Sequence, residues 1–235
     1  MNLLVSKKPL EHPRLGPTLE LEDVQTLLLG AGGHASVLHD MLLTLGDPPK
    51  GVIDATLEPG TTWEGLPVLG DDDLLATFSP EEFALVNGLG ASPNCIPRNR
   101  LYERFRKQGF SFPPLVHPSA VLAHSVVLHP GCQIMAGAIL QSGVTVGENS
   151  VINTRASVDH HCHIASGAFI SPGAVLCGNV SIGEGAFIGA GAVLLPDISV
   201  GAGAVVGAGS VVLKDVGENS TVVGNPAKIL GSSVF

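Results

Sequence analysis

The sequence predicts a small parallel α/β domain followed by a parallel β-helix. In the second half of the chain, every sixth residue from Leu122 to Val212 is Leu, Ile or Val. Two positions earlier in each hexapeptide, from Ala120 to Val216, stands a small or β-branched residue, most often preceded by Gly. The first half instead alternates short aliphatic runs with glycine-containing turns and helix-like segments. A change of period therefore divides the chain into two kinds of structure.

The six-residue period is typical of a parallel β-helix built from hexapeptide repeats. The aliphatic residue points inward, the small residue packs beneath it, and the residue before it forms a corner where Gly, Asn or Asp tolerates positive φ. An amphipathic α-helix is excluded, because a period of six does not stay on one face of a 3.6-residue turn. Three hexapeptides make one triangular coil, so residues 120–216 supply about five coils.

The N-terminal half reads as alternating strands and helices, which indicates a parallel α/β domain. We expect strands at 24–29, 51–54 and 83–87, helices at 35–45 and 98–108, and a helix opening over 71–76. Residues 67–70 are expected to be a connection, and the proline-rich segment 110–118 joins the two parts. The predicted domains are an N-terminal extension over 1–22, a Rossmann-like domain over 23–112, and a β-helix with a C-terminal tail over 113–235.

Composition excludes several function classes. The formal net charge of −9 over 235 residues disfavours an electrostatic nucleic-acid surface. The four cysteines form no CxxC pair, so neither a zinc knuckle nor a disulfide framework is indicated, and reduced cysteines in a cytoplasmic protein are expected. The first residues lack an apolar stretch long enough for a signal peptide or a membrane span.

The turn Gly30-Ala-Gly-Gly-His34 is the first candidate site, because it lies where a predicted strand feeds a helix. Glycines there let backbone amides approach a phosphate at the helix N-terminus. Ala35 stands where a dinucleotide fingerprint would have its last glycine, so a nucleotide diphosphate is favoured over NAD. Asp54, at the end of the second strand, is placed to contact a ribose or sugar hydroxyl, and His34 to reach a phosphate or sugar. The alternative is a purely structural turn without a ligand.

The second candidate site is the run Asp159-His160-His161-Cys162-His163. His161 falls at a corner where neighbouring coils have Gly143 and Asn179, and local turn chemistry does not require histidine there. A neutral imidazole at His160 can act as a general base. An exposed corner histidine without a role, and a metal shared between histidines of several subunits, are the alternatives. No carboxylate partner for a metal is evident, and no metal site is assigned. Cys162, as a nucleophile, is disfavoured by its inward register.

Together, the Gly-Gly-His turn, the uninterrupted hexapeptides, the Asp-His-His-Cys corner and the tail Val223-Gly-Asn-Pro-Ala-Lys228 resemble the sugar O-/N-acetyltransferase family. This family includes sialic-acid O-acetyltransferases and the N-acetyltransferases for UDP-bacillosamine and GDP-perosamine precursors. The resemblance covers about residues 24–230. It implies a left-handed β-helix, a homotrimer, a nucleotide sugar held by the N-terminal domain, and acetyl-CoA in a groove between adjacent β-helices.

Residue by residue, the resemblance implies that His160 is the general base and that the substrate is bound at Gly32, Gly33, His34, Asp54 and Gly88. Ala190 and Ala208, which are one coil apart, match backbone contacts to acetyl-CoA. Two positions depart from the family pattern. The family has Glu or Asp directly after the base, where this chain has His161, and Asp159 on the other side is a candidate substitute. Phe169 stands where many members have a histidine near the CoA thioester.

We therefore expect a cytoplasmic, trimeric enzyme that transfers acetyl directly from acetyl-CoA to the amino group of a UDP- or GDP-linked sugar. Backbone amides of the coil would stabilise the oxyanion. Three alternatives stay open at this point: O-acetylation of a sugar hydroxyl as in the sialic-acid enzymes, a metal-dependent hydratase of the same architecture, and a non-catalytic nucleotide-sugar sensor.

Overall fold

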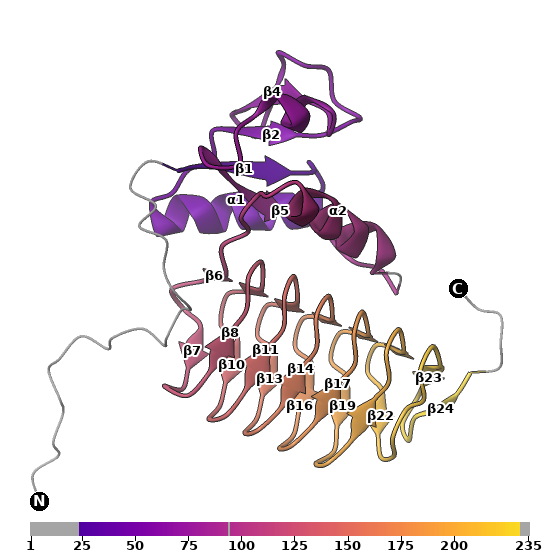
Figure 1. Cartoon of the computed structure of the whole chain (residues 1–235). Coiled ribbons are helices and arrows are strands. Elements are labelled where there is room, and N and C mark those ends of the chain that lie inside the picture. The colour runs from indigo at the N-terminus through magenta and orange to yellow at the C-terminus, as the bar shows by residue number, and fades with distance from the viewer. Residues whose placement is uncertain (1–23, 94, 231–235) are drawn as a thin grey trace, which may run out of the picture.

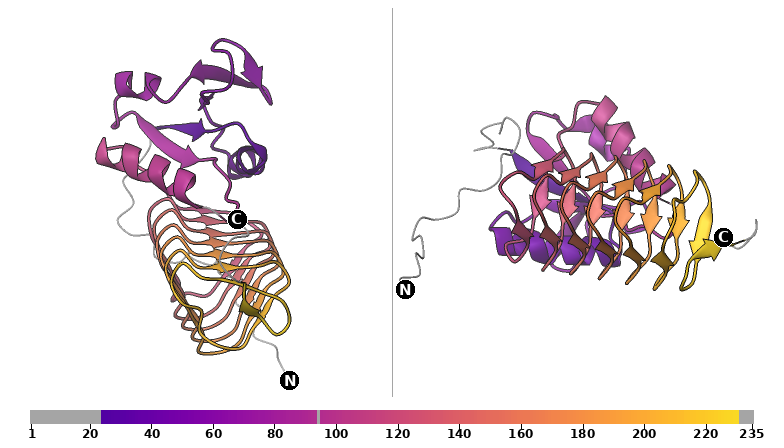
Figure 2. Two further views of the ribbon diagram at one scale, coloured as in Figure 1. Left: turned by 90° about the vertical axis from the view of Figure 1, so that its right-hand side faces the viewer. Right: turned by 90° about the horizontal axis from the view of Figure 1, so that it is seen from below.

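The computed structural model describes residues 24–93 and 95–230. The N-terminal domain lies along one side of a long β-helix, and α1 and α2 are the elements nearest to the coils (Figure 1). Viewed along its axis, the β-helix is a stack of triangular coils with the α/β domain over one side (Figure 2). The predicted N-terminal extension over 1–22 lies outside the described residues, as does the end of the tail over 231–235.

The α/β domain contains a five-stranded sheet of order β3-β4-β2-β1-β5. Its parallel strands are β1 (Gln25–Leu29), β2 (Gly51–Ile53), β4 (Leu66–Gly70) and β5 (Phe83–Asn87), and β3 (Thr62–Trp63) is antiparallel to β4. The helices are α1 (Gly33–Leu45), α2 (Ile96–Lys107) and the short 3₁₀ helix η1 (Leu74–Thr77). Because β1 and β2 lie inside the sheet and are covered on both faces, their aliphatic residues are fully buried, as is usual in parallel sheets.

Two expectations for this domain need correction. Residues 67–70 are not a connection: they belong to β4, where Val68 pairs with Val52 of β2. Pro67 makes this strand difficult to recognise in the sequence, although its exposed position on the strand tolerates proline. The two helices also begin earlier than expected. Gly33 and His34 already lie in the first turn of α1, and α2 starts at Ile96 with Pro97 in its first turn, where a missing N–H costs nothing.

The β-helix is formed by three sheets whose neighbouring strands are parallel and 18 residues apart, except at the end of the third sheet. The first sheet contains β7 (Val121–Leu122), β10 (Ile139–Leu140), β13 (Ser157–Val158), β16 (Val175–Leu176), β19 (Val193–Leu194) and β22 (Val211–Val212). The second contains β8 (Val127–Leu128), β11 (Thr145–Val146), β14 (His163–Ile164), β17 (Ser181–Ile182) and β20 (Ser199–Val200). The third contains β6 (Leu115–Val116), β9 (Gln133–Ile134), β12 (Val151–Ile152), β15 (Phe169–Ile170), β18 (Phe187–Ile188), β21 (Val205–Val206), β23 (Thr221–Val223) and β24 (Lys228–Ile229). At the end of this third sheet, β23 pairs with β21 at a distance of 16 residues, and β24 is antiparallel to β23. Strands β6 and β23 lie outside the repeat range 120–216 but within the predicted β-helix domain over 113–235.

The corners of the β-helix follow the predicted register. Positive φ angles occur at every sixth residue from Gly131 to Gly209. Most of these corners are glycine, and the others are Asn149, Arg155, His161, Asn179 and Asp197. The aliphatic residues between the corners form one continuous buried core along the prism axis. The hexapeptide prediction is therefore confirmed.

The outer face of the third sheet is covered by the α/β domain. Met135, Val151 and Phe169 from this sheet share a buried cluster with Leu38 and other residues of α1. Polar contacts add to it, such as the 2.7 Å hydrogen bond from the Tyr102 hydroxyl of α2 to Glu148 at a β-helix corner. The two parts thus pack through a mixed apolar and polar interface, and this interface positions the candidate site.

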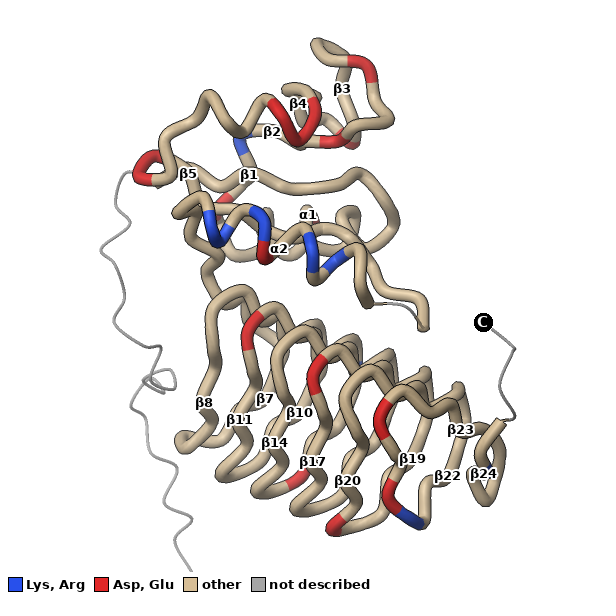
Figure 3. The backbone as a smooth tube through the Cα atoms, turned by 45° about the vertical axis from the view of Figure 1, so that its right-hand side comes forward, with Lys and Arg blue, Asp and Glu red and all other residues tan. Residues whose placement is uncertain are grey.

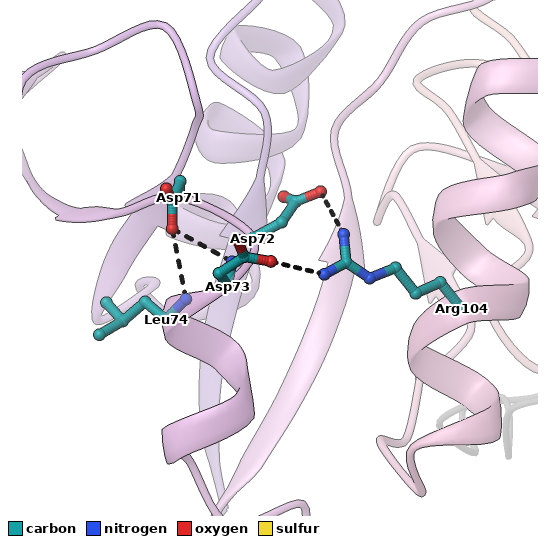
Figure 4. A network of polar contacts seen from close by, with 5 residues as sticks. All are labelled: Asp71, Asp72, Asp73, Leu74 and Arg104. Carbon is teal, nitrogen blue, oxygen red and sulfur yellow. Dashed lines mark hydrogen bonds and ion pairs between the residues drawn. The ribbon is translucent and has the colours of Figure 1, made fainter.

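Lys and Arg gather on α2, whereas the coils carry scattered acidic positions and few basic ones (Figure 3). Arg104 of α2 pairs with Asp72 at 3.2 Å and with Asp73 at 3.0 Å, next to η1 (Figure 4). Asp71 accepts the N–H of Leu74, the first residue of the same short helix (Figure 4). The ion pairs tie the segment between β4 and β5 to α2. Of the helices in the described part of the chain, none has the length and apolarity needed to cross a bilayer.

Candidate active site

A cavity of about 640 Å³ opens where the α/β domain meets the β-helix. The α/β domain contributes the start of α1 and the segment after β5, and the β-helix contributes two phenyl rings and a column of corners. Its lining residues are His34, Val37, Gly90, Ala91, Pro93, Asn153, Thr154, Phe169, Ser171, Pro172, Phe187, Gly189, Ala190, Val205, Gly207 and Ala208. The cavity thus reaches the predicted substrate turn at His34 and the predicted cofactor column at Ala190 and Ala208, whereas Gly32, Gly33 and Asp54 are not among its lining residues.

The turn before α1 is open toward solvent. A Cβ atom on Gly32 or Gly33 would meet no atom within 4 Å, so packing within the described residues does not explain these glycines. No side chain caps the start of α1, whose first backbone N–H groups have no partner within the helix. The geometry fits the approach of an anionic group to backbone amides.

Asp54 stabilises this turn from within. Its carboxylate accepts the N–H of Ala31 at 2.8 Å and the N–H of Thr56 at 2.8 Å. Partial burial alone would raise the pKa of Asp54, but the hydrogen bonds from Thr56 and Ala31 outweigh it and hold the pKa below its ordinary value. The structure therefore gives the carboxylate a role in shaping the turn, next to the predicted contact with a ribose.

Gly88 follows β5 and is buried under the same turn. A Cβ atom there would lie 2.6 Å from the Leu29 carbonyl oxygen and 2.8 Å from the Ala35 Cβ. Glycine at this position is required for close packing of β1, β5 and α1. Gly88 is not among the cavity-lining residues, so its packing role explains its identity.

His34 lies between the two domains at the cavity wall. Its Nε2 is 2.8 Å from Oε1 of Gln133 on β9, and its ring centroid is 6.0 Å from that of Phe169. Burial, together with the nearby positive charge of Arg98, lowers the pKa of His34 to about 4. The imidazole is therefore neutral at pH 7.

The β-helix side of the cavity combines two phenyl rings with small corner residues. Phe169 and Phe187 stack with centroids 5.8 Å apart and an interplanar angle of 10°. Ala190 and Ala208 lie on successive coils, linked by a 2.8 Å hydrogen bond from the Gly209 N–H to the Ala190 carbonyl. Their predicted stacking is confirmed. Phe187 was missed by sequence reasoning, although its 18-residue distance from Phe169 would have identified it.

The histidine pair is at a different corner of the prism. His161 has a φ of 58°, as expected from its corner register. The Nδ1 atoms of His160 and His161 are 3.1 Å apart, so the two rings hydrogen-bond directly. Asp159 accepts the backbone N–H of His160 at 2.7 Å and therefore contacts the main chain rather than the imidazole. Within the described residues, His161 is the side chain placed to orient the His160 ring.

One chain does not bring the histidine pair to the cavity. His160 lies on the corner between β13 and β14, whereas Ala190 and Ala208 lie on the corners that follow β18 and β21. The whole width of the first sheet separates these two edges. A site that uses both must be completed by a second copy of the chain.

The histidine corner does not favour a nucleophilic cysteine or a metal site. Cys162 is 1% exposed, donates its thiol to the Cys177 carbonyl at 3.1 Å, and has a pKa raised by burial, all of which disfavour a nucleophilic thiolate. Within residues 24–93 and 95–230, no group of three or more His, Cys, Asp or Glu side chains is arranged to hold a metal ion.

A hexapeptide β-helix, an α/β domain with an open glycine turn, and a cavity joining them define an acyltransferase of the hexapeptide class. Two family models match the chain: the PglD N-terminal domain over residues 25–105, and the bacterial transferase hexapeptide over residues 161–196 and 179–214.

Three solved structures are similar over 88% of this chain. The acetyltransferase domain of PglB from Neisseria gonorrhoeae FA1090, solved with acetyl coenzyme A, is 36% identical and covered over 100% of its length, with a TM-score of 0.81. PerB from Caulobacter crescentus, solved with CoA and GDP-perosamine, is 36% identical and covered over 97%, with a TM-score of 0.81. WeeI from Acinetobacter baumannii AYE is 29% identical and covered over 100%, with a TM-score of 0.79.

The chain therefore belongs to the family of left-handed β-helix sugar acetyltransferases, and it is an acetyltransferase. The predicted family, fold class and enzyme class are confirmed.

Proposed function

We propose that this protein transfers the acetyl group of acetyl-CoA to the amino group of a nucleotide-linked amino sugar. The observation that carries this proposal is the cavity, which extends from His34 at the end of the glycine turn to the corner column at Ala190 and Ala208. The similar PglB domain holds acetyl coenzyme A, and PerB holds CoA with GDP-perosamine. The proposal therefore places both substrates of a direct transfer at this cavity.

The two substrates occupy different parts of the site. The diphosphate of the nucleotide sugar binds at Gly32 and Gly33, where the N-terminal amides of α1 and the helix dipole favour an anion. Acetyl-CoA lies along the corners at Ala190 and Ala208, with its acetyl end near Phe169. Holding both substrates in one cavity converts a bimolecular reaction into an effectively unimolecular one, which supplies a large part of the rate gain.

His160 acts as the general base. Its Nδ1 donates a hydrogen bond to Nδ1 of His161, so Nε2 keeps a lone pair for the acceptor amine. As the amine nitrogen attacks the thioester carbonyl, Nε2 takes the proton, and backbone N–H groups of the coil stabilise the oxyanion. The tetrahedral intermediate then expels the CoA sulfur, which leaves as the thiol with the proton from His160.

A homotrimer in the cytoplasm completes the proposal, because the base and the cavity lie on different edges of the prism. The sheet between those edges exposes Val121, Ile139 and Val175, whose outward side chains are 60%, 37% and 37% exposed. Burying this aliphatic stripe against a neighbouring copy stabilises an assembly and brings His160 of one chain to the cavity of the next.

The test measures CoA thiol released from acetyl-CoA with a panel of UDP- and GDP-linked 4-amino sugars and matched hydroxy sugars. Wild type is compared with His160→Ala and with a control, His124→Ala, which occupies the same corner position two coils earlier. We expect turnover with one amino sugar that is lost only in His160→Ala. Turnover with hydroxy sugars alone would establish O-acetylation instead, and no release with any acceptor would overturn the proposal.

A further inference from the structure

A set of buried hydrogen bonds leads from α2 to His34. Arg98 is 1% exposed, and its Nη1 donates to the backbone carbonyl of Asn87 at 2.9 Å. Gln133 is 2% exposed, and its Nε2 donates to the same carbonyl at 2.9 Å. The Asn87 carbonyl oxygen thus accepts two hydrogen bonds. Because it has no hydrogen to donate, the Gln133 amide must face it with its nitrogen.

This arrangement determines which way the Gln133 amide points. A flipped amide would place its oxygen against the carbonyl oxygen of Asn87, with no hydrogen between them. The Gln133 Oε1 therefore faces Nε2 of His34, and that nitrogen must carry a hydrogen to donate across their 2.8 Å contact. Within the described part of the chain, no hydrogen-bond partner is found for the other ring nitrogen, Nδ1, and the ring lines the cavity.

The surroundings of His34 oppose a second proton on the ring. Arg98 approaches from α2 with a positive charge, and the nearby Cys95 thiol has a pKa raised by burial to about 11. The β-helix presents Gln133 and Phe169, which do not ionise. On α1 itself, His39 pairs with Glu64 at 3.6 Å. Among the described residues no carboxylate forms an ion pair with His34 or Arg98.

We propose that Gln133 is a positioning residue that fixes the hydrogen of the neutral His34 ring on Nε2 and so leaves Nδ1 as an acceptor, and that the ligand group bound at Nδ1 is a donor. A hydroxyl or an amine of the substrate sugar fits this position. A fully ionised phosphate does not, because its oxygens only accept hydrogen bonds. The identity of the ligand rests on the proposed function, whereas the state of the imidazole does not. A buried site built for a donor also rejects analogues that lack one.

The first test needs no turnover. Ring ¹⁵N chemical shifts of the full-length protein labelled at histidine distinguish protonated from unprotonated nitrogens, and His34→Phe identifies the His34 signals. We expect, at pH 7, a protonated Nε2 and an unprotonated Nδ1, and loss of this pattern in Gln133→Met. An imidazolium, or a hydrogen on Nδ1, would overturn the inference even if acetyl transfer is observed.

The second test separates positioning from structural support. In Gln133→Met, we expect the KM for the sugar acceptor to rise about tenfold, equivalent to about 1.4 kcal/mol, with kcat and the KM for acetyl-CoA nearly unchanged. In Gln133→Glu, the carboxylate favours the imidazolium, so the acceptor KM should rise as pH falls from 8 to 6, whereas the wild-type KM stays flat. Gln108→Met, at an exposed position after α2, is the control.

Wild-type KM values in both Gln133 variants, at all pH values, would refute the positioning role. If thermal melting shows that Gln133→Met does not fold, the KM of Gln133→Glu still tests the positioning role, and the ¹⁵N measurement on wild type still tests the position of the hydrogen on His34. Absence of acetyl transfer in wild type with every amino sugar would count against the proposed function and leave the ¹⁵N result standing.

Discussion

The Nδ1 atoms of His160 and His161 lie 3.1 Å apart at one corner of the β-helix. Only one of these nitrogens can donate, so the pair shares a single hydrogen, and the ring that donates keeps its Nε2 free. The family pattern has an acidic residue in place of His161. Here an imidazole takes the orienting position, while the carboxylate of Asp159 is engaged with the main chain.

The orienting role of His161 predicts a graded response to substitution. His161→Leu removes the partner of Nδ1, and loss of such a supporting contact typically costs 10- to 100-fold in activity. We expect kcat to fall by about tenfold or more with both KM values unchanged. His161→Glu restores an acceptor and should recover most of kcat. Equal kcat values for wild type and His161→Leu, in steady-state assays of CoA release, would refute the role.

Gly178 makes room for the His160 ring. It lies one coil further along the same corner, and a Cβ atom there would be only 2.4 Å from Cε1 of His160. Gly178→Ala should therefore displace the imidazole and lower kcat by at least tenfold. The control is Gly217→Ala, where the nearest atom to a new Cβ is 3.4 Å away. A fall in thermal stability that matches the fall in kcat would point to misfolding rather than to displacement of the base.

A bulky residue at Ala208 should block the cofactor column. Ala208 is exposed and lines the cavity, so Ala208→Trp fills space without disturbing the buried core. We expect acetyl-CoA binding, measured by calorimetry, to weaken by at least tenfold. Ala202→Trp stands one hexapeptide earlier, on another edge of the prism, and should bind acetyl-CoA as wild type does. Tight binding by Ala208→Trp would show that the cofactor lies elsewhere.

Through its ionisation, Asp54 is expected to make the stability of the glycine turn depend on pH. Its folded-state pKa is depressed, so its contribution to stability is present above the unfolded value of about 3.9 and is lost as pH falls through the lower folded value. In Asp54→Asn, the amide cannot ionise. Its NH₂ group replaces one of the two carboxylate oxygens and cannot accept a hydrogen bond, so the N–H of either Ala31 or Thr56 loses its acceptor. We expect a higher KM for the nucleotide sugar and an unchanged KM for acetyl-CoA.

The same variant should also respond less steeply to acid. Thermal melting between pH 5 and pH 2 is expected to show a smaller loss of stability for Asp54→Asn than for wild type. A parallel loss in both proteins would mean that the carboxylate is not the group that titrates in this range.

Much of the β-helix was predictable because its rules are local. Each hexapeptide carries its own inward residue and its own corner, so the positive φ at His161 and the stacking of Ala190 on Ala208 follow from counting in sixes and eighteens. The glycine turn and the first helix were also predictable from the strand–turn–helix pattern. Strand β4 was missed because Pro67 interrupts a short run of five residues, in which alternation is difficult to recognise.

The sequence by itself determined the repeat register, the two-domain order and the chemical types present at the site. Only the tertiary structure decided how these chemical groups are held. The contact between His34 and Gln133 joins residues 99 positions apart, and it exists because α1 packs across the third sheet. No local pattern encodes such a contact, since it depends on how two separately folded surfaces meet. The protonation state of His34 follows from that burial, and so does the chemistry it can offer a ligand.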